Sequence, residues 1–149
     1  MAATTAICSS FKKEVLEAGH NFKLTGGNTF KAALIIPGMA GTYGAASTNY
    51  SNITGNSDEC PATGGYATGG ATLTRVDPVL SGTTAYTDFA DVVYSAATIS
   101  ARAVMIYNAS LSNAAVGVFD FGSTISSTNG NWTLTFPTAD ASNAVIRIN

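Results

Sequence analysis

Charged side chains are scarce in this sequence. They make up 11% of its 149 residues, against roughly 25% in typical soluble domains. The formal net charge is −2, so the chain has no broad basic field of the kind that attracts nucleic-acid phosphates. All four lysines lie in the first 31 residues, where glutamates offset them and Lys13 can pair with Glu17 on a helix face. We expect no nucleic-acid partner.

Histidine is nearly absent, and this limits the chemistry available. His20 is the single histidine, and without a second histidine or paired cysteines the usual zinc and copper sites cannot be built. A catalytic triad would have to use His20, and no G-x-S-x-G elbow is present. His20 follows a predicted helix, where a structural role is expected because a charged imidazole suits the negative end of the helix dipole. We expect no catalytic residue, metal or cofactor.

Long apolar runs are also missing. None approaches the ~20 residues of a membrane-spanning helix, and the N-terminus lacks the basic and apolar regions of a signal peptide. These features predict a protein that is assembled in the cytoplasm and has no membrane partner. In that compartment Cys8 and Cys60, which lack metal-site spacing, are expected to be reduced and buried, although a single disulfide is compatible with the sequence.

Small residues replace the missing charge. Ala, Thr, Ser and Gly are abundant throughout, and hydrophobic residues make up 46% of the chain. This length suits one domain, residues 1–149, with a core large enough to need no disulfide or metal. Because monomeric proteins usually keep a charged surface for solubility, the composition favours a protein whose surface is covered by neighbouring subunits.

The periodicity predicts one short helix, at about residues 7–18. Its apolar face comprises Ile7, Phe11, Val15 and Ala18. Ser9 or Ser10 is expected to cap its start, and Gly19 is expected to end it in the left-handed conformation. Such a short helix must pack on a larger element to be stable.

The composition of residues 37–70, which are rich in Gly, Ser and Thr and show no periodicity, predicts a long loop. Long loops in compact domains are often functional. Tyr43, Tyr50 and Tyr66 are spread through it, and tyrosines give a surface stiff contact area with a polar tip. The alternative is that these tyrosines fix the loop to its own sheet, and the sequence does not separate the two.

The remaining segments predict short strands. A central strand is expected at Thr29–Ile36, which is apolar on nearly both faces. Further strands are expected at Ala71–Val76, Thr84–Tyr94, Ile99–Tyr107, Ala115–Phe121, Asn131–Phe136 and Ala144–Ile148. Asp77-Pro78 and other turn signals separate them, and Trp132, Leu134 and Phe136 share one face. Strands at this spacing predict an all-β fold, an antiparallel, jelly-roll-like β-sandwich with one short N-terminal α-helix.

Two arginines interrupt apolar strands. Arg102 and Arg147 each need a carboxylate or carbonyl partner in such a setting. Asp88, Asp91 and Asp120 are the candidates, either within the chain or across a subunit interface.

Two acidic pairs could in principle support chemistry. Asp88 and Asp91 are three residues apart in a predicted strand, so their side chains are expected to point to opposite faces. Unless a bulge intervenes, they cannot form the carboxylate pair of a glycan-cleaving enzyme. Asp58 and Glu59 lie in the long loop without the pattern of a calcium-binding loop. Neither pair favours an enzyme.

Seven segments carry a resemblance to a known family. They are Ser10–Phe22, Asn28–Leu34, Gly64–Leu73, Asp88–Asp91, Ser100–Asn108, Ala115–Gly122 and Phe136–Asp140. Together they resemble a family of small virion structural proteins of tailed bacteriophages and prophages, over nearly the whole chain. The resemblance implies a virion component, as a capsid decoration protein or a tail or fibre attachment, and it supplies no catalytic residues.

The sequence thus predicts a non-enzymatic virion protein that decorates or cements the capsid. Its expected partners are copies of itself and the phage major capsid protein or tail and fibre subunits. The alternative is a tail or head-fibre appendage that binds host surface glycan through the loop tyrosines. The predicted interface residues are Phe11, Val15, Tyr43, Tyr50, Tyr66, Arg102 and Arg147.

Overall fold

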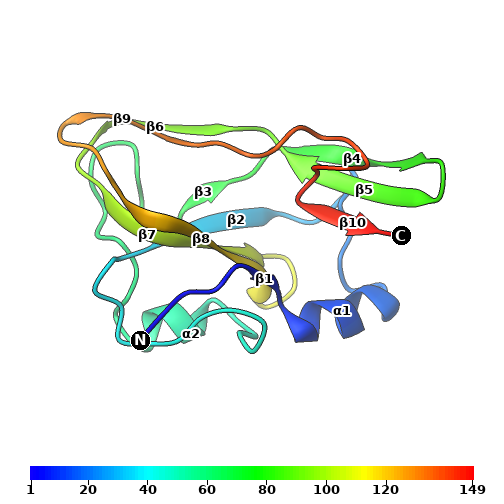
Figure 1. Cartoon of the computed structure of the whole chain (residues 1–149), viewed down its shortest axis with the longest axis horizontal. Coiled ribbons are helices and arrows are strands. Elements are labelled where there is room, and N and C mark those ends of the chain that lie inside the picture. Colours follow the sequence, from blue (N-terminus) through cyan, green and yellow to red (C-terminus); the bar gives the residue numbers. More distant parts are fainter.

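Ten strands and two helices make up the fold in a computed structural model that describes residues 1–149. The largest sheet has five strands, all paired antiparallel (Figure 1). Its order is β1 (Ala6–Ile7), β8 (Ala114–Ser126), β7 (Ser100–Asn108), β2 (Phe30–Ile35) and β3 (Ala71–Thr72). As predicted, β2 is an interior strand, because it is paired on both sides and almost wholly buried.

Two smaller antiparallel sheets complete the strands. One has the order β10 (Ile146–Ile148), β5 (Thr84–Phe89) and β4 (Arg75–Ser81), and the other pairs β6 (Val92–Ala97) with β9 (Gly130–Leu134). In Figure 1 the two-stranded sheet lies above the five-stranded sheet and the three-stranded sheet lies to its right, while α1 (Ser9–Leu16) and the single-turn α2 (Ser51–Thr54) lie below. The predicted all-β antiparallel sandwich with a short N-terminal helix is confirmed. Neither helix is long or apolar enough to span a membrane.

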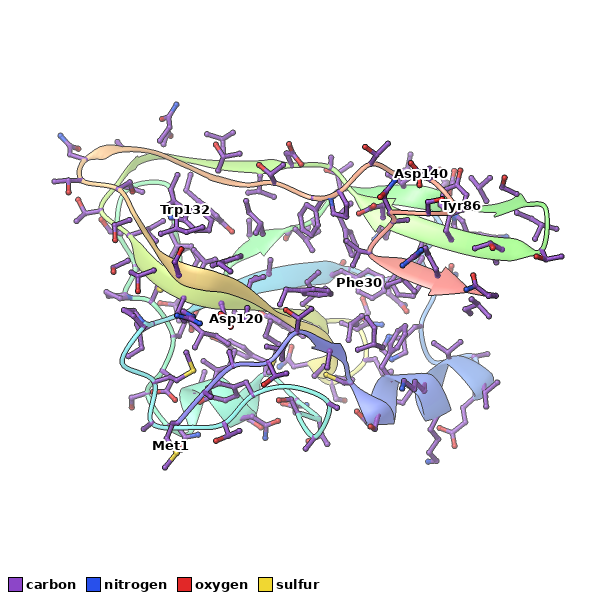
Figure 2. All side chains as sticks on the ribbon, in the orientation of Figure 1. Met1, Phe30, Tyr86, Asp120, Trp132 and Asp140 are labelled. Carbon is purple, nitrogen blue, oxygen red and sulfur yellow. The ribbon has the colours of Figure 1, made fainter.

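The sheets share one core of 30 buried residues. Phe22 and Phe30 stack with ring centroids 4.4 Å apart, and Phe30 on β2 lies 5.8 Å from Phe89 on β5. These rings join the segment after α1 to two sheets. On β9 the predicted alternation is confirmed, since Trp132 and Leu134 are buried while Thr133 is exposed. Figure 2 shows Phe30 and Trp132 between the layers.

The N-terminal helix is shorter than its periodicity predicts. It begins at Ser9 because Ile7 belongs to β1 and pairs with Gly117 of β8. The residue at its N-cap is Cys8, which makes no side-chain capping bond. The prediction that Ser9 or Ser10 caps the helix was therefore wrong.

The end of α1 also differs from the prediction. Ala18, not Gly19, is left-handed, with φ of 57°. The N–H of Gly19 donates to the carbonyl of Glu14 at 2.8 Å, and that of Ala18 donates to the carbonyl of Val15 at 3.1 Å. These two bonds form a Schellman motif, which closes the helix with alanine at the position that glycine usually takes.

Two predicted strands are divided in the structure. The segment 71–76 contributes to both β3 and β4, and Asp77-Pro78, predicted as a turn, lies inside β4 at a shift of register between Val76 and Val79. The segment 84–94 crosses from β5 to β6 at Ala90 and Asp91, where the Asp91 carboxylate accepts the N–H of Phe136. The chain changes sheet at that point, so one predicted strand supplies two strands of different sheets.

Candidate interaction surface

An apolar groove lies between α1 and the three-stranded sheet. We call it the α1–β10 groove. Phe11, Val15, Ile146 and Ile148 line both of its two adjoining hollows. The outer hollow has a volume of about 360 Å³ and is completed by Ile7, Lys12, Leu16 and Arg147. The inner hollow is completed by residues that include Pro78, Ala85 and Tyr86.

Burial changes along both elements that form this groove. On α1, Phe11 turns into the core and is 4% exposed, whereas Leu16 is 89% exposed. On β10, Ile146 is buried, whereas Ile148 is 57% exposed. Contiguous exposed apolar surface of this kind marks contact sites in soluble proteins. Phe11, Val15 and Arg147, three of the predicted interface residues, lie on this surface.

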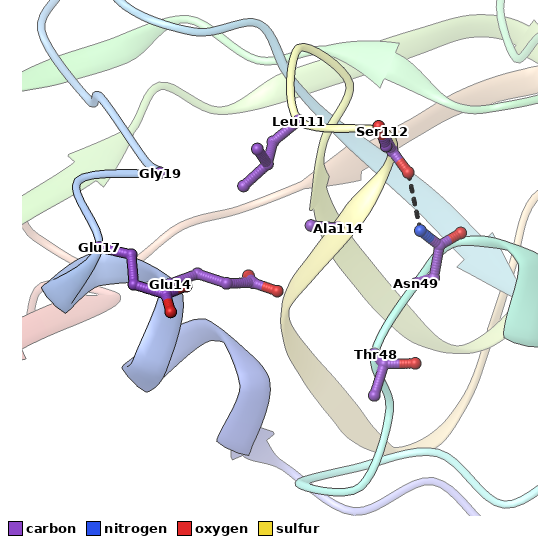
Figure 3. Close-up of a pocket in the computed structure, with 8 residues that line it drawn as sticks. All are labelled: Glu14, Glu17, Gly19, Thr48, Asn49, Leu111, Ser112 and Ala114. Atoms are coloured by element: carbon purple, nitrogen blue, oxygen red, sulfur yellow. Dashed lines mark hydrogen bonds between the residues drawn. The ribbon is translucent and has the colours of Figure 1, made fainter.

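The opposite side of α1 is acidic. Glu14 and Glu17 border a separate pocket whose far wall includes Thr48, Asn49 and Ser112 (Figure 3). The Asn49 amide donates to the Ser112 carbonyl at 2.7 Å and closes that wall. The helix therefore presents acidic side chains to this pocket, and it presents apolar and basic side chains to the α1–β10 groove.

His20 links α1 to the end of β7. Its Nε2 lies 2.7 Å from Glu14 Oε2, and its Nδ1 lies 3.1 Å from the amide nitrogen of Asn108. The Asn108 side-chain oxygen accepts the N–H of Ser110, so the amide nitrogen must face the imidazole. Nδ1 is then an acceptor and Nε2 the donor to Glu14. The imidazole therefore has a structural role, because its two ring nitrogens join α1 to the end of β7.

The buried carboxylate of Asp58 holds the first half of the long loop. It is 2% exposed and accepts the N–H groups of Ala40 and Gly41, at 2.8 and 2.7 Å, and the hydroxyl of Tyr43. Burial alone would raise the pKa of Asp58, but these three hydrogen bonds more than offset it and hold the pKa below its usual value. The carboxylate is therefore an internal anchor.

Glu59 anchors the second half of the loop in the same way. Its carboxylate accepts the hydroxyls of Tyr50 and Tyr66, at 2.5 and 2.9 Å, and the N–H of Gly69 at 2.6 Å. The Tyr66 hydroxyl also accepts the N–H of Leu34 on β2. The loop is thus bonded to the five-stranded sheet.

These contacts decide between the two interpretations of the loop tyrosines. Tyr43 and Tyr66 are 2% and 1% exposed, so they fix the loop to the chain itself and do not form an exposed surface. Burial, followed by the bond to Asp58, raises the pKa of Tyr43 to about 12. Tyr50 is half-buried and stacks on Tyr107, with ring centroids 4.6 Å apart.

Both arginines find partners inside the chain. Arg102 binds Asp120 through two hydrogen bonds of 2.6 and 3.0 Å, and this contact lowers the pKa of Asp120. Arg147 donates to the carbonyls of Ala141 and Ser142.

The other acidic candidates differ in burial. The buried Asp88 accepts the N–H groups of Phe89 and Val145, whereas Asp91 is exposed and lies between β5 and β6. Burial, followed by smaller contributions that include the charge of Asp91, raises the pKa of Asp88. No group of three or more His, Cys, Asp or Glu side chains is placed to hold a metal ion. Cys8 and Cys60 are buried and free, as expected.

Comparisons of this chain with protein-family models, curated proteins and solved structures give no match. The candidate surface therefore rests on geometry. Sequence reasoning missed Leu16, Ile146 and Ile148 as members of it. The available signal was a leucine beside the apolar stripe of the helix and isoleucines at alternate positions of the last strand.

Proposed function

We propose that this chain is a non-enzymatic structural subunit of a bacteriophage virion, which decorates or cements the capsid by packing against neighbouring subunits. The observation that carries the proposal is the α1–β10 groove, in which Leu16 and Ile148 leave large apolar side chains in water. Covering them against a neighbour would release that surface from water and stabilise the assembly.

The use of the ionisable side chains supports the non-enzymatic part of the proposal. His20, Asp58, Glu59 and Asp120 all engage hydrogen-bonding partners within the chain and hold elements together. The assignment to a phage particle comes from the sequence resemblance. Weak contacts suffice in that setting, because a symmetric array multiplies them through effective concentration.

The glycan-binding alternative is weakened by the loop. It depended on an aromatic surface formed by Tyr43, Tyr50 and Tyr66, and two of these three rings are buried. The capsid-decoration proposal is therefore the one that the geometry supports better.

The test is binding of the purified chain to phage capsids stripped of their decoration protein, measured by co-sedimentation. We expect the wild-type chain to bind and Leu16→Asp to bind at least about tenfold more weakly, because a carboxylate would replace an apolar contact. Val93→Asp is the matched control, since Val93 is 56% exposed on β6, outside the groove. Failure of the wild-type chain to bind, or equal loss in both variants, would contradict the proposal.

A further inference from the structure

We propose that the free edge of β10 accepts, as an added strand, an extended segment of a neighbouring subunit that is not a copy of this chain, and that this segment carries alternate apolar side chains and a carboxylate. This inference rests on the proposed function and names the way in which the contact is made. Adding a strand to a sheet edge gives affinity through backbone hydrogen bonds and specificity through alternate side chains.

The two edges of the three-stranded sheet differ. At one edge, β4 contains Pro78, which has no N–H to donate, and a shift of register between Val76 and Val79. Both features obstruct pairing with another strand. At the other edge, β10 contains no proline and pairs with β5 from Ile146 to Ile148 without a shift. One edge is blocked and the other is open.

The open edge is also the one that borders the groove. In Figure 1, β10 lies between β5 and α1. Side chains of a strand alternate between its two faces, so Ile146 and Ile148 lie on the same face, and both line the groove. An added strand would place its own alternate side chains beside these isoleucines, within reach of Val15 and Leu16.

Charge defines the partner further. Of the eight residues that line the outer hollow, Lys12 and Arg147 are basic and none is acidic. Lys12 belongs to none of the three ion pairs of the chain. The acidic residues of the helix, Glu14 and Glu17, face the pocket on its other side (Figure 3). In an added strand that alternates apolar and acidic residues, the apolar side chains would lie beside Ile146 and Ile148 and the carboxylates beside Arg147, where lysines would instead meet a like charge.

The test uses isotope-labelled full-length chain and three blocked seven-residue peptides. The first alternates valine with glutamate, the second replaces glutamate with lysine, and the third is the first peptide with alternate amides N-methylated. N-methylation keeps the side chains and removes the N–H donors that strand pairing needs. Amide shifts and hydrogen exchange at residues 146–148 are recorded during each titration.

We expect the glutamate peptide to shift and protect these amides, and the other two peptides to bind at least about tenfold more weakly. Ile148→Asp should abolish the response. Val93→Asp should keep it, because its side chain is as exposed as that of Ile148 but lies outside the groove.

Several outcomes would overturn the inference. Equal binding of the lysine peptide would remove the charge selection, and equal binding of the N-methylated peptide would show side-chain docking without strand addition. If no peptide binds, both the strand addition and the charge selection are contradicted. Concentration-dependent shifts of the same amides without peptide would identify a second copy as the occupant. If the chain binds stripped capsids but its β10 amides stay unprotected there, strand addition fails while the proposed function stands.

Discussion

Replacing Asp58 with alanine should destabilise the fold strongly. The carboxylate is 2% exposed and accepts three hydrogen bonds, from Ala40, Gly41 and Tyr43. Asp58→Ala leaves the N–H groups of Ala40 and Gly41 without an acceptor and removes the bond from the Tyr43 hydroxyl, which keeps only the carbonyl of Asn52 at 3.3 Å. Each lost bond costs about 1–2 kcal/mol after some relaxation and entry of water. The expected loss of unfolding free energy is about 3–6 kcal/mol, a large part of the 5–15 kcal/mol typical of a domain.

Urea unfolding followed by the fluorescence of Trp132 measures this loss. Trp132 is the single tryptophan and is 3% exposed, so it reports global unfolding. Asp140→Ala is the matched control. The Asp140 carboxylate also accepts several hydrogen bonds, from Ser142 and Asn143, but at the surface, where water can replace it. The control variant should lose much less stability.

The loss of unfolding free energy in Asp58→Ala should also depend on pH, in a direction that the pKa of Asp58 defines. Because its hydrogen bonds hold the pKa of Asp58 below its usual value, the carboxylate contributes fully above the ordinary carboxyl pKa. That contribution is lost as the pH falls through the lower pKa of the folded state. The stability difference between wild type and Asp58→Ala should therefore narrow below about pH 4. A loss no larger than that of Asp140→Ala, or a difference that widens on acidification, would refute the anchoring role.

Three further predictions concern other positions. Ala18→Gly should raise the free energy of unfolding in urea by roughly 0.5–1 kcal/mol, because a left-handed φ of 57° strains alanine but not glycine; destabilisation would contradict the assigned cap. Tyr66→Phe should lower the same quantity by about 1–3 kcal/mol, since the N–H of Leu34 loses its acceptor; an unchanged urea midpoint would count against this. Burial raises the pKa values of the Cys8 and Cys60 thiols to about 11 and about 12. These thiols should therefore react with a thiol reagent only as fast as the chain unfolds, and rapid labelling of the native protein would disprove their burial.

The sequence predicted the parts of the fold that local patterns determine. The continuous apolar run before Pro37 predicted the interior strand β2, and the alternation of Trp132 and Leu134 with threonines predicted β9. In these segments burial follows directly from the order of side chains, because a strand alternates its faces with a fixed period of two.

Features that depend on distant contacts could not be predicted. Asp77-Pro78 is a strong local turn signal, yet it lies in β4 because an edge strand tolerates proline at a shift of register. Ala18 takes the left-handed position because α1 ends at Leu16, one residue too early for Gly19 to occupy that position. Such choices depend on what the rest of the chain packs against these segments.

The interaction surface was predicted only in part. Phe11 and Val15 follow from the helical stripe, but the groove exists because β10 lies beside α1, and these elements are at opposite ends of the sequence. The role of the loop tyrosines also depended on contacts that the sequence does not reveal. Their composition was compatible both with an exposed surface and with attachment to the chain's own sheet, and the structure shows that Asp58 and Glu59 accept their hydroxyl groups and hold the loop against the sheet.

The position of the α1–β10 groove in an image reconstruction of the intact particle tests the proposed role most directly. We predict that a neighbouring subunit covers Leu16 and Ile148 and that its backbone continues the three-stranded sheet beyond β10. A reconstruction in which this groove faces solvent on every copy of the chain would contradict the assembly role proposed for it.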